Sequence, residues 1–178
     1  QILMDLKKFI RSIPDYPKKG ILFRDITTLI KNEKAFKETI NQIVERSKKF
    51  DFNKIAAIES RGFVFASAVS YILNKPFILL RKKNKLPSDT HSVDFELEYG
   101  TATIEVHKDS INKDDSVLII DDLVATGGTA EAAAKLVNIS NGNVAAFIFV
   151  INLFDLGGCK NLIKKGFKVE NLIEFPGH

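Results

Sequence analysis

Residues 117–129 of the chain read Val-Leu-Ile-Ile-Asp-Asp-Leu-Val-Ala-Thr-Gly-Gly-Thr. The four aliphatic residues predict a buried strand, 117–120, that ends at the adjacent carboxylates Asp121 and Asp122. The alanine-rich run 130–137 after the turn predicts a helix. This order is typical of an α/β fold, in which ligands bind where the strands end.

The turn between this strand and this helix is suited to phosphate. Gly127 and Gly128 let the backbone come close to a ligand, and the free N–H groups at the helix start attract phosphate oxygens. Thr126 and Thr129 add hydroxyl donors, and Thr129 is also a candidate N-cap. Because the preceding carboxylates can accept hydrogen bonds from ribose hydroxyls, the stretch predicts a sugar-phosphate site.

An ordinary strand, turn and helix cap is the alternative interpretation, because Asp, Gly and Thr are common in turns. It accounts for one Asp and one Thr, but not for two carboxylates, two glycines and two threonines within nine positions. Two other glycine-rich phosphate motifs, G-x-x-x-x-G-K-[ST] and G-x-G-x-x-G, do not occur in the sequence. We therefore favour a functional site.

The length and composition predict one soluble domain. A chain of 178 residues can form a sizeable core as a single domain, residues 1–178. Its hydrophobic content of 45% and charged content of 27% are ordinary, and no apolar run approaches the roughly 20 residues of a membrane span. No signal-peptide pattern opens the sequence, and a single cysteine, Cys159, fits a reducing cytoplasm. We expect a cytoplasmic protein with no membrane partner.

The net charge of +4 favours a polyanionic partner, either nucleic acid or a small pyrophosphate. Most of the excess consists of lysines that we expect on solvated helix faces. The localised exception is the basic run 81–85, Arg-Lys-Lys-Asn-Lys. The three histidines are too dispersed to form a metal site with one cysteine.

Aliphatic runs alternate with helical patterns along the chain. Besides 117–120, the expected strands are 55–58, 76–80, 101–107, 144–151 and 172–175, and the expected helices are 32–50, 63–73, 130–137 and 157–165. We expect an irregular entry segment at 12–19 and a mobile loop at 86–99. Uninterrupted aliphatic strands between helices predict a mainly parallel sheet with helices on both faces.

Three of the expected strands are followed by segments with charged residues. These segments are Glu59-Ser60-Arg61-Gly62, the basic run 81–85, and the pair Asp121 and Asp122. Because the carboxyl ends of parallel strands meet at one edge of a sheet, we expect the three segments to converge on one site.

Segments in order along nearly the whole chain carry a family resemblance. They are Gly20-Ile21-Leu22-Phe23-Arg24-Asp25-Ile26-Thr27, Ser60-Arg61-Gly62-Phe63, Arg81-Lys82 with Lys85-Leu86-Pro87, Leu97-Glu98-Tyr99-Gly100, and the Asp-Asp…Gly-Gly-Thr stretch quoted above. Together they resemble the adenine phosphoribosyltransferases, a family of type I phosphoribosyltransferases. The runs 152–158 and 175–178 are similar to those of its bacterial branch.

The resemblance implies an α/β type I phosphoribosyltransferase fold, a mainly parallel sheet flanked by helices, with a mobile catalytic loop and a small N-terminal hood. It implies purine salvage: adenine and phosphoribosyl pyrophosphate (PRPP) give AMP and pyrophosphate, with Mg²⁺ bound through PRPP near Asp121 and Asp122. It further implies a homodimer in which basic residues reach across the interface, no nucleic-acid partner, and a cis peptide at Glu59–Ser60.

The resemblance also assigns residues to tasks. Glu98, Tyr99 and Arg61 would be catalytic, with Glu98 stabilising positive charge at ribose C1 or handling the adenine N9 proton. Adenine would lie among Leu22, Phe23, Arg24, Leu123 and Leu153. PRPP and AMP would be bound by Arg61, Arg81, Lys82, Lys85, Asp121, Asp122, Ala125, Thr126, Gly127, Gly128 and Thr129.

Simpler interpretations stay open at this point. Arg61 could form a surface salt bridge, the run 81–85 could be solvated, and Glu98 and Tyr99 could be ordinary residues of a loop–strand junction. Three other functions also use this fold: transfer to a 6-oxopurine, a purine-responsive regulator that binds nucleic acid, and an inactive scaffold. The first would favour a charged residue in place of Leu123, and the second generally adds a DNA-binding domain or a distinct basic face.

Overall fold

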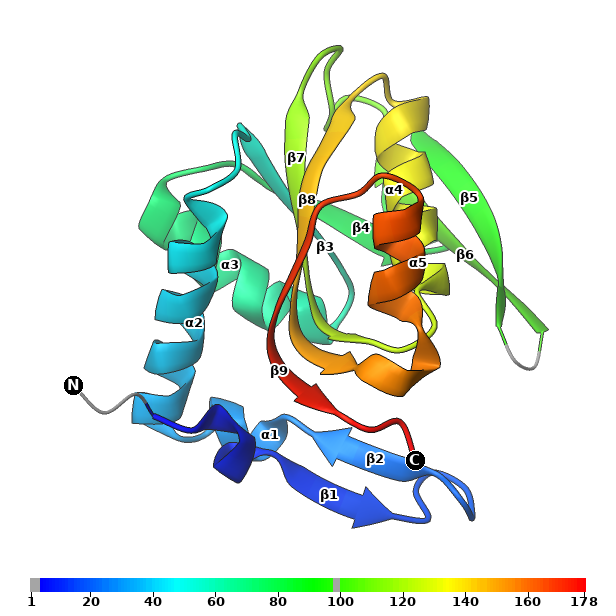
Figure 1. The fold of residues 1–178 in the computed structure, drawn as a ribbon. Helices are drawn as coiled ribbons and strands as arrows, with labels where there is room; N and C mark the ends of the chain where they lie inside the picture. The colour runs from blue at the N-terminus through cyan, green and yellow to red at the C-terminus, as the bar shows by residue number, and fades with distance from the viewer. Residues whose placement is uncertain (1–3, 98–99) are drawn as a thin grey trace.

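A computed structural model describes residues 4–97 and 100–178 (Figure 1). Its large sheet has seven strands in the order β5-β6-β4-β3-β7-β8-β9. The strands β3, β4, β7, β8 and β9 run parallel, and β5 and β6 run antiparallel at one edge. Their bounds are β3 Lys54–Ile58, β4 Phe77–Lys82, β5 Thr90–Leu97, β6 Gly100–His107, β7 Ser116–Val124, β8 Asn143–Leu153 and β9 Val169–Phe175. The predicted mainly parallel sheet is confirmed.

Helices cover both faces of this sheet, α2 (Glu33–Ser47) and α3 (Arg61–Leu73) on one side and α4 (Gly128–Ile139) and α5 (Gly158–Lys164) on the other (Figure 1). Alternate residues of β7 pack on opposite sides, so both faces of the strand are buried. This is why its sequence is an uninterrupted aliphatic run. Within the described ranges, no helix is long and apolar enough to cross a membrane.

The N-terminal segment forms a small unit beside the large sheet, with the C-terminal residues next to it (Figure 1). It consists of η1 (Leu6–Phe9), the antiparallel pair β1 (Arg11–Pro14) and β2 (Leu22–Asp25), and α1 (Thr27–Ile30). An ion pair of 2.5 Å between Arg11 and the buried Asp25 joins the two strands. This unit corresponds to the predicted hood.

Two expectations about irregular segments were wrong in part. Residues 90–97 of the expected loop 86–99 form β5, because Val93 and Phe95 pack on the core while Ser92, Asp94 and Glu96 are exposed. Residues 11–14, which overlap the expected entry segment 12–19, form β1. In both places the strand lies at the margin of the fold, and its inward-facing residues alternate with exposed ones. It therefore contains few apolar residues.

Cys159 is buried on the α5 side of the sheet and its thiol is free. Burial, with a smaller contribution from the charge of Glu174, raises its pKa to about 11. A thiol with that pKa stays protonated at neutral pH.

Candidate functional site

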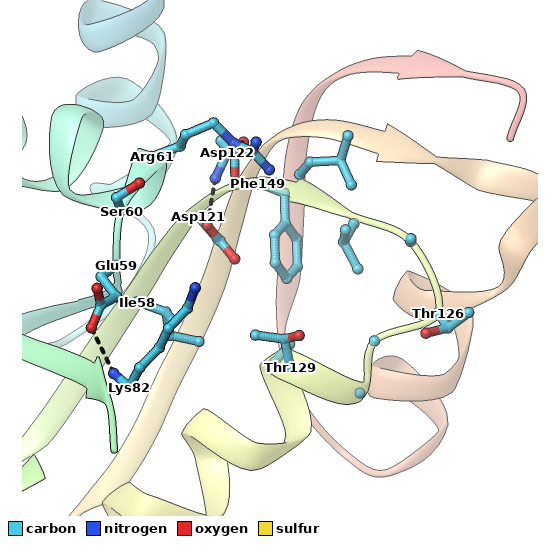
Figure 2. Close-up of a pocket in the computed structure, with 16 residues that line it drawn as sticks. Ile58, Glu59, Ser60, Arg61, Lys82, Asp121, Asp122, Thr126, Thr129 and Phe149 are labelled. Atoms are coloured by element: carbon cyan, nitrogen blue, oxygen red, sulfur yellow. Dashed lines mark hydrogen bonds and ion pairs between the residues drawn. The ribbon is translucent and has the colours of Figure 1, made fainter. Parts of the chain in front are cut away.

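The carboxyl ends of β3, β4 and β7 border a cavity of about 370 Å³ (Figure 2). Its lining comes from residues 58–61, 82, 121–130 and 149. Ligand cavities in proteins commonly measure about 300–1,000 Å³, so this one is large enough for a small ligand. The three strand-end segments that we expected to converge all contribute to it.

The two carboxylates lie inside β7, not after it as the sequence suggested. β7 continues to pair with β8 as far as Val124, whereas its pairing with β3 reaches only Ile119. The strand therefore extends past its neighbour on one side, and residues 121–122 face the space that β3 leaves. The segment 59–61 borders that same space, with a cis peptide at Glu59–Ser60 as expected.

Arg61 and Asp122, which both line the cavity, lie next to each other and form an ion pair (Figure 2). Arg61 Nε lies 2.6 Å from Asp122 Oδ2, and the side chain of Arg61 is 54% exposed while that of Asp122 is 9% exposed. The buried carboxylate is thus paired, and much of the guanidinium still faces solvent. Arg61 thus forms a salt bridge, as the simpler interpretation predicted, but its partner is a residue of the cavity.

Asp121 is the most perturbed titratable group of the site. Burial, the charge of Asp122 and their side-chain contact raise its pKa well above the ordinary value, although the Asp122 backbone N–H and Arg61 act in the opposite direction. Asp122 N donates to Asp121 Oδ1 at 2.8 Å. A Cβ at Gly62 would lie 2.9 Å from the same oxygen, so only glycine leaves room for this carboxyl group.

The loop 125–129 leads directly into α4. Gly127 is the N-cap with φ of +93°, and its carbonyl accepts a hydrogen bond from Glu131 N at 2.9 Å. Thr129 is therefore inside the first turn and is not the N-cap that we expected, but it still lines the cavity. The N–H groups of the first turn have no acceptor within the helix and are directed at this end of the site.

Gly158 supports this loop and was missed from sequence. Its N–H donates to Ala125 O at 3.0 Å. A Cβ at position 158 would lie 2.5 Å from the same oxygen and 3.0 Å from Gly127 N. The pair Gly157-Gly158 was quoted only for its family resemblance, and no local pattern shows which distant backbone it contacts.

The basic run is held at the end of β4 by Glu59 (Figure 2). Glu59 Oε1 accepts a hydrogen bond from Lys82 N at 2.6 Å and lies 3.3 Å from Arg81 Nε. Burial would raise the pKa of Glu59, but this hydrogen bond and the charge of Arg81 outweigh it and lower the pKa. Lys82 lines the cavity, whereas Arg81 and Lys85 do not.

A second carboxylate, Glu105, holds the following turn. It accepts hydrogen bonds from Asn84 N at 2.9 Å and from Ser92 Oγ at 2.5 Å. Asn84 has φ of +66°, a conformation that Asn adopts more readily than most residues. Lys85 N donates to Lys82 O at 3.3 Å and closes the turn. Glu59 was expected at the site only as part of its segment, without a role, and Glu105 was not expected at all, because each acts through a partner distant in sequence.

The five residues assigned to adenine are only partly brought together. Leu123 lines the cavity, and the Phe23 ring centroid lies 6.0 Å from Arg61 Cζ. Leu22 and Phe23 are half-buried on β2, whereas Leu153 is buried in the core. The guanidinium of Arg24 points away from the cavity, toward residues 175–176. Glu98 and Tyr99 lie outside the described residues.

Residues 25–175 match the family model "Phosphoribosyl transferase domain". The chain is 80% identical over 175 residues to the adenine phosphoribosyltransferase of Pelagibacter ubique, with 98% of this chain and 100% of that protein covered. It is 45% identical to the crystal structure of adenine phosphoribosyltransferase from Thermoanaerobacter pseudethanolicus, with a TM-score of 0.93 and coverage of 98% and 100%. The enzyme of Saccharomyces cerevisiae, complexed with an imino-altritol bisphosphate and adenine, is 32% identical with a TM-score of 0.86 and coverage of 94% and 96%.

Proposed function

Since the chain belongs to the adenine phosphoribosyltransferase family, we propose that it converts adenine and PRPP into AMP and pyrophosphate in purine salvage. Adenine N9 forms the new bond to ribose C1, the bond from C1 to the pyrophosphate oxygen breaks, and the N9 proton is lost. The observation that carries the proposal is the convergence of a phosphate loop, two carboxylates and Arg61 on one cavity.

The loop 125–129 would bind the 5′-phosphate of PRPP. Its backbone approaches closely at Gly127 and Gly128, and the N-terminal end of α4 favours negative charge. Thr126 and Thr129 also line the cavity and can donate from their hydroxyls. On this placement the ribose hydroxyls would reach the carboxylates of Asp121 and Asp122.

Mg²⁺ fits this donor set. The cavity offers the carboxylate oxygens of Asp121 and Asp122, and within the described ranges no group of three or more His, Cys, Asp or Glu is arranged to hold a metal. Mg²⁺ typically binds through one or two carboxylates together with substrate phosphates. When bound with PRPP it would supply charge neutralisation to the leaving pyrophosphate.

The basic residues at the rim would bind pyrophosphate. The exposed guanidinium of Arg61 can exchange its carboxylate partner for phosphate oxygens, which bind guanidinium equally well. Lys82 lines the cavity, and Arg81 and Lys85 lie on either side of Lys82 in the sequence. Since Glu59 and Glu105 hold this run at the cavity, its charge is better suited to a small pyrophosphate than to nucleic acid.

Adenine would lie between Leu123 in the lining and Phe23 on the hood strand. A flat apolar space suits a purine ring, and backbone groups can recognise its amino group. Roles of Leu22, Arg24 and Leu153 near the base remain predictions, as do those of Glu98 and Tyr99 over ribose C1.

We also propose a homodimer. Val64, Tyr71 and Ile72 are exposed on one side of α3, and Leu79 is exposed on β4. A gathering of large apolar side chains at the surface marks an interaction site. Leu79 and Arg81 are two residues apart on one strand and face the same way, so the basic residue borders the apolar surface and could reach a partner's cavity.

Two broader expectations remain proposals. Residues 1–178 would fold as one domain, because both apolar clusters pack on the same large sheet. A cytoplasmic location would suit a chain whose only cysteine is buried as a free thiol.

The purified protein should be mixed with PRPP and Mg²⁺ and offered adenine, hypoxanthine, guanine and xanthine separately, with products separated by chromatography. We expect AMP from adenine and no nucleotide from the other bases. IMP, GMP or XMP would overturn the choice of base. Tight PRPP binding without any product would overturn the enzymatic function.

A further inference from the structure

We propose that residues 175–177 form a clasp that holds β2 over the cavity and thereby sets the affinity for adenine, through Arg24 and Asp155. The inference rests on the proposed function and assigns the side chain of Arg24 a positioning role in place of direct contact with the base. Neither Asp155 nor Gly177 lines the cavity.

Arg24 links the hood to the last described residues. Its Nη2 donates to Pro176 O at 3.1 Å, and its Cζ lies 4.4 Å from the ring centroid of Phe175, which is buried. Its Nη1 donates to Ser12 Oγ at 2.6 Å, so the same guanidinium also fixes β1. A cation over an aromatic face is attracted by the ring, so this contact also holds the hood to Phe175.

The clasp is fixed at its other end by Asp155, in the short helix η2 (Phe154–Leu156). Asp155 Oδ1 accepts a hydrogen bond from Gly177 N at 2.6 Å. A Cβ at position 177 would lie 2.6 Å from Leu156 Cγ and 2.8 Å from Asp155 Oδ1. An alanine at position 177 would therefore require either these side chains of η2 or the segment 175–177 to shift.

The geometry of β2 connects this clasp to the cavity. Successive side chains of a strand point to opposite sides, so Phe23 faces away from the guanidinium of Arg24. Phe23 is the residue that approaches Arg61, at 6.0 Å. The pair β1 and β2 forms a sheet separate from the seven-stranded one, so it does not share that sheet's hydrogen-bonded ladder. Contacts of the Arg24 side therefore help to determine where Phe23 lies, together with the buried Ile26 and Leu29, which anchor the hood in the core.

A loosened clasp should weaken adenine binding and leave PRPP binding largely unchanged. The phosphate loop has a hydrogen bond of its own, from Gly158 N to Ala125 O, in which none of the clasp residues takes part. A binding surface that is already ordered does not have to be ordered when the ligand binds, and this increases affinity. When the clasp is loosened, the effect should therefore appear mainly in the KM of the ligand that β2 covers.

The test compares Gly177→Ala and Asp155→Ala with the wild type in steady-state kinetics and PRPP calorimetry. We expect KM for adenine to rise about tenfold, with kcat and the Kd of PRPP within about twofold. Asp155→Asn keeps the acceptor oxygen and should restore KM. Gly142→Ala is the matched control, since its Cβ would lie 2.8 Å from Ile111 Cγ2, remote from the cavity lining, and it should leave KM unchanged.

An unchanged KM for adenine in both clasp variants would overturn the proposal, as would equal weakening of adenine and PRPP. Hydrogen exchange of the β1 and β2 amides provides a readout that does not need activity. It should be faster in Gly177→Ala than in Gly142→Ala, and equal rates would also refute the clasp. A wild type without activity on adenine would instead refute the proposed function, while the exchange result still decides the clasp.

Discussion

At the residue scale, Asp121 shows how a ligand site can oppose stability. Its carboxyl group is placed beside Asp122 under Gly62, where burial and a like charge raise its pKa. Ribose hydroxyls or a cation would favour the carboxylate form instead. Binding of PRPP with Mg²⁺ should therefore release a proton and become tighter as pH rises.

Asp121→Asn should raise the free energy of unfolding at neutral pH and abolish tight PRPP binding. In the folded protein the pKa of Asp121 lies above the ordinary value of 3.8. The carboxyl group therefore disfavours folding increasingly as pH rises from 3.8 toward the raised pKa of the folded protein. A gain in melting temperature is expected at neutral pH, because the amide carries no charge that burial and Asp122 would disfavour. Thermal unfolding at several pH values measures it, and the gain should shrink toward pH 3.8.

The matched control is Asp122→Asn, because it removes the partner of Arg61. It should weaken PRPP binding too, but it should lower stability. A gain of stability in both variants, or in neither, would contradict this assignment of the two carboxylates.

At the element scale, the link between β7 and α4 depends on Gly127. Its φ of +93° is a left-handed conformation, and a Cβ there would lie 3.2 Å from Gly158 Cα. Gly127→Ala should cost about 1–2 kcal/mol of stability and weaken PRPP binding at least tenfold. The reason is that both the left-handed backbone strain and the contact of the added Cβ with Gly158 would move the loop. Calorimetry with PRPP and thermal unfolding measure the two effects.

Gly166 offers a close control for this prediction. It has φ of +94°, but no atom lies within 4 Å of a Cβ built there. Gly166→Ala should lose similar stability and keep wild-type PRPP affinity. If it weakens PRPP binding as much as Gly127→Ala does, general destabilisation explains both results.

Elements with strong local signals were predictable from sequence. The aliphatic strands and the helices between them were placed correctly, and the three strand ends meet as expected. The full length of β7 could not be predicted, because its continuation past Ile119 depends on pairing with β8, which is distant in sequence. For the same reason Gly158 and Glu105, whose partners are distant, could not be found, and β5 was too polar to stand out.

At the scale of the whole molecule, the apolar surface of α3 and β4 predicts self-association. Tyr71 is 89% exposed. A charge there should oppose burial in an interface, so Tyr71→Asp should give a monomer in light scattering coupled to size exclusion. Ile163→Asp, on α5 at the other face of the sheet, is the control, and we expect it to stay dimeric. A wild type that is already monomeric would contradict the prediction.

Buried Cys159 has a practical consequence for such experiments. It is the only cysteine in the sequence, and its raised pKa keeps the thiol in the unreactive form at neutral pH. A second cysteine introduced at an exposed position would therefore react with maleimide dyes almost alone, without prior mutation of the native residue. Site-specific fluorophores could then be attached to this chain while its own thiol stays in the core.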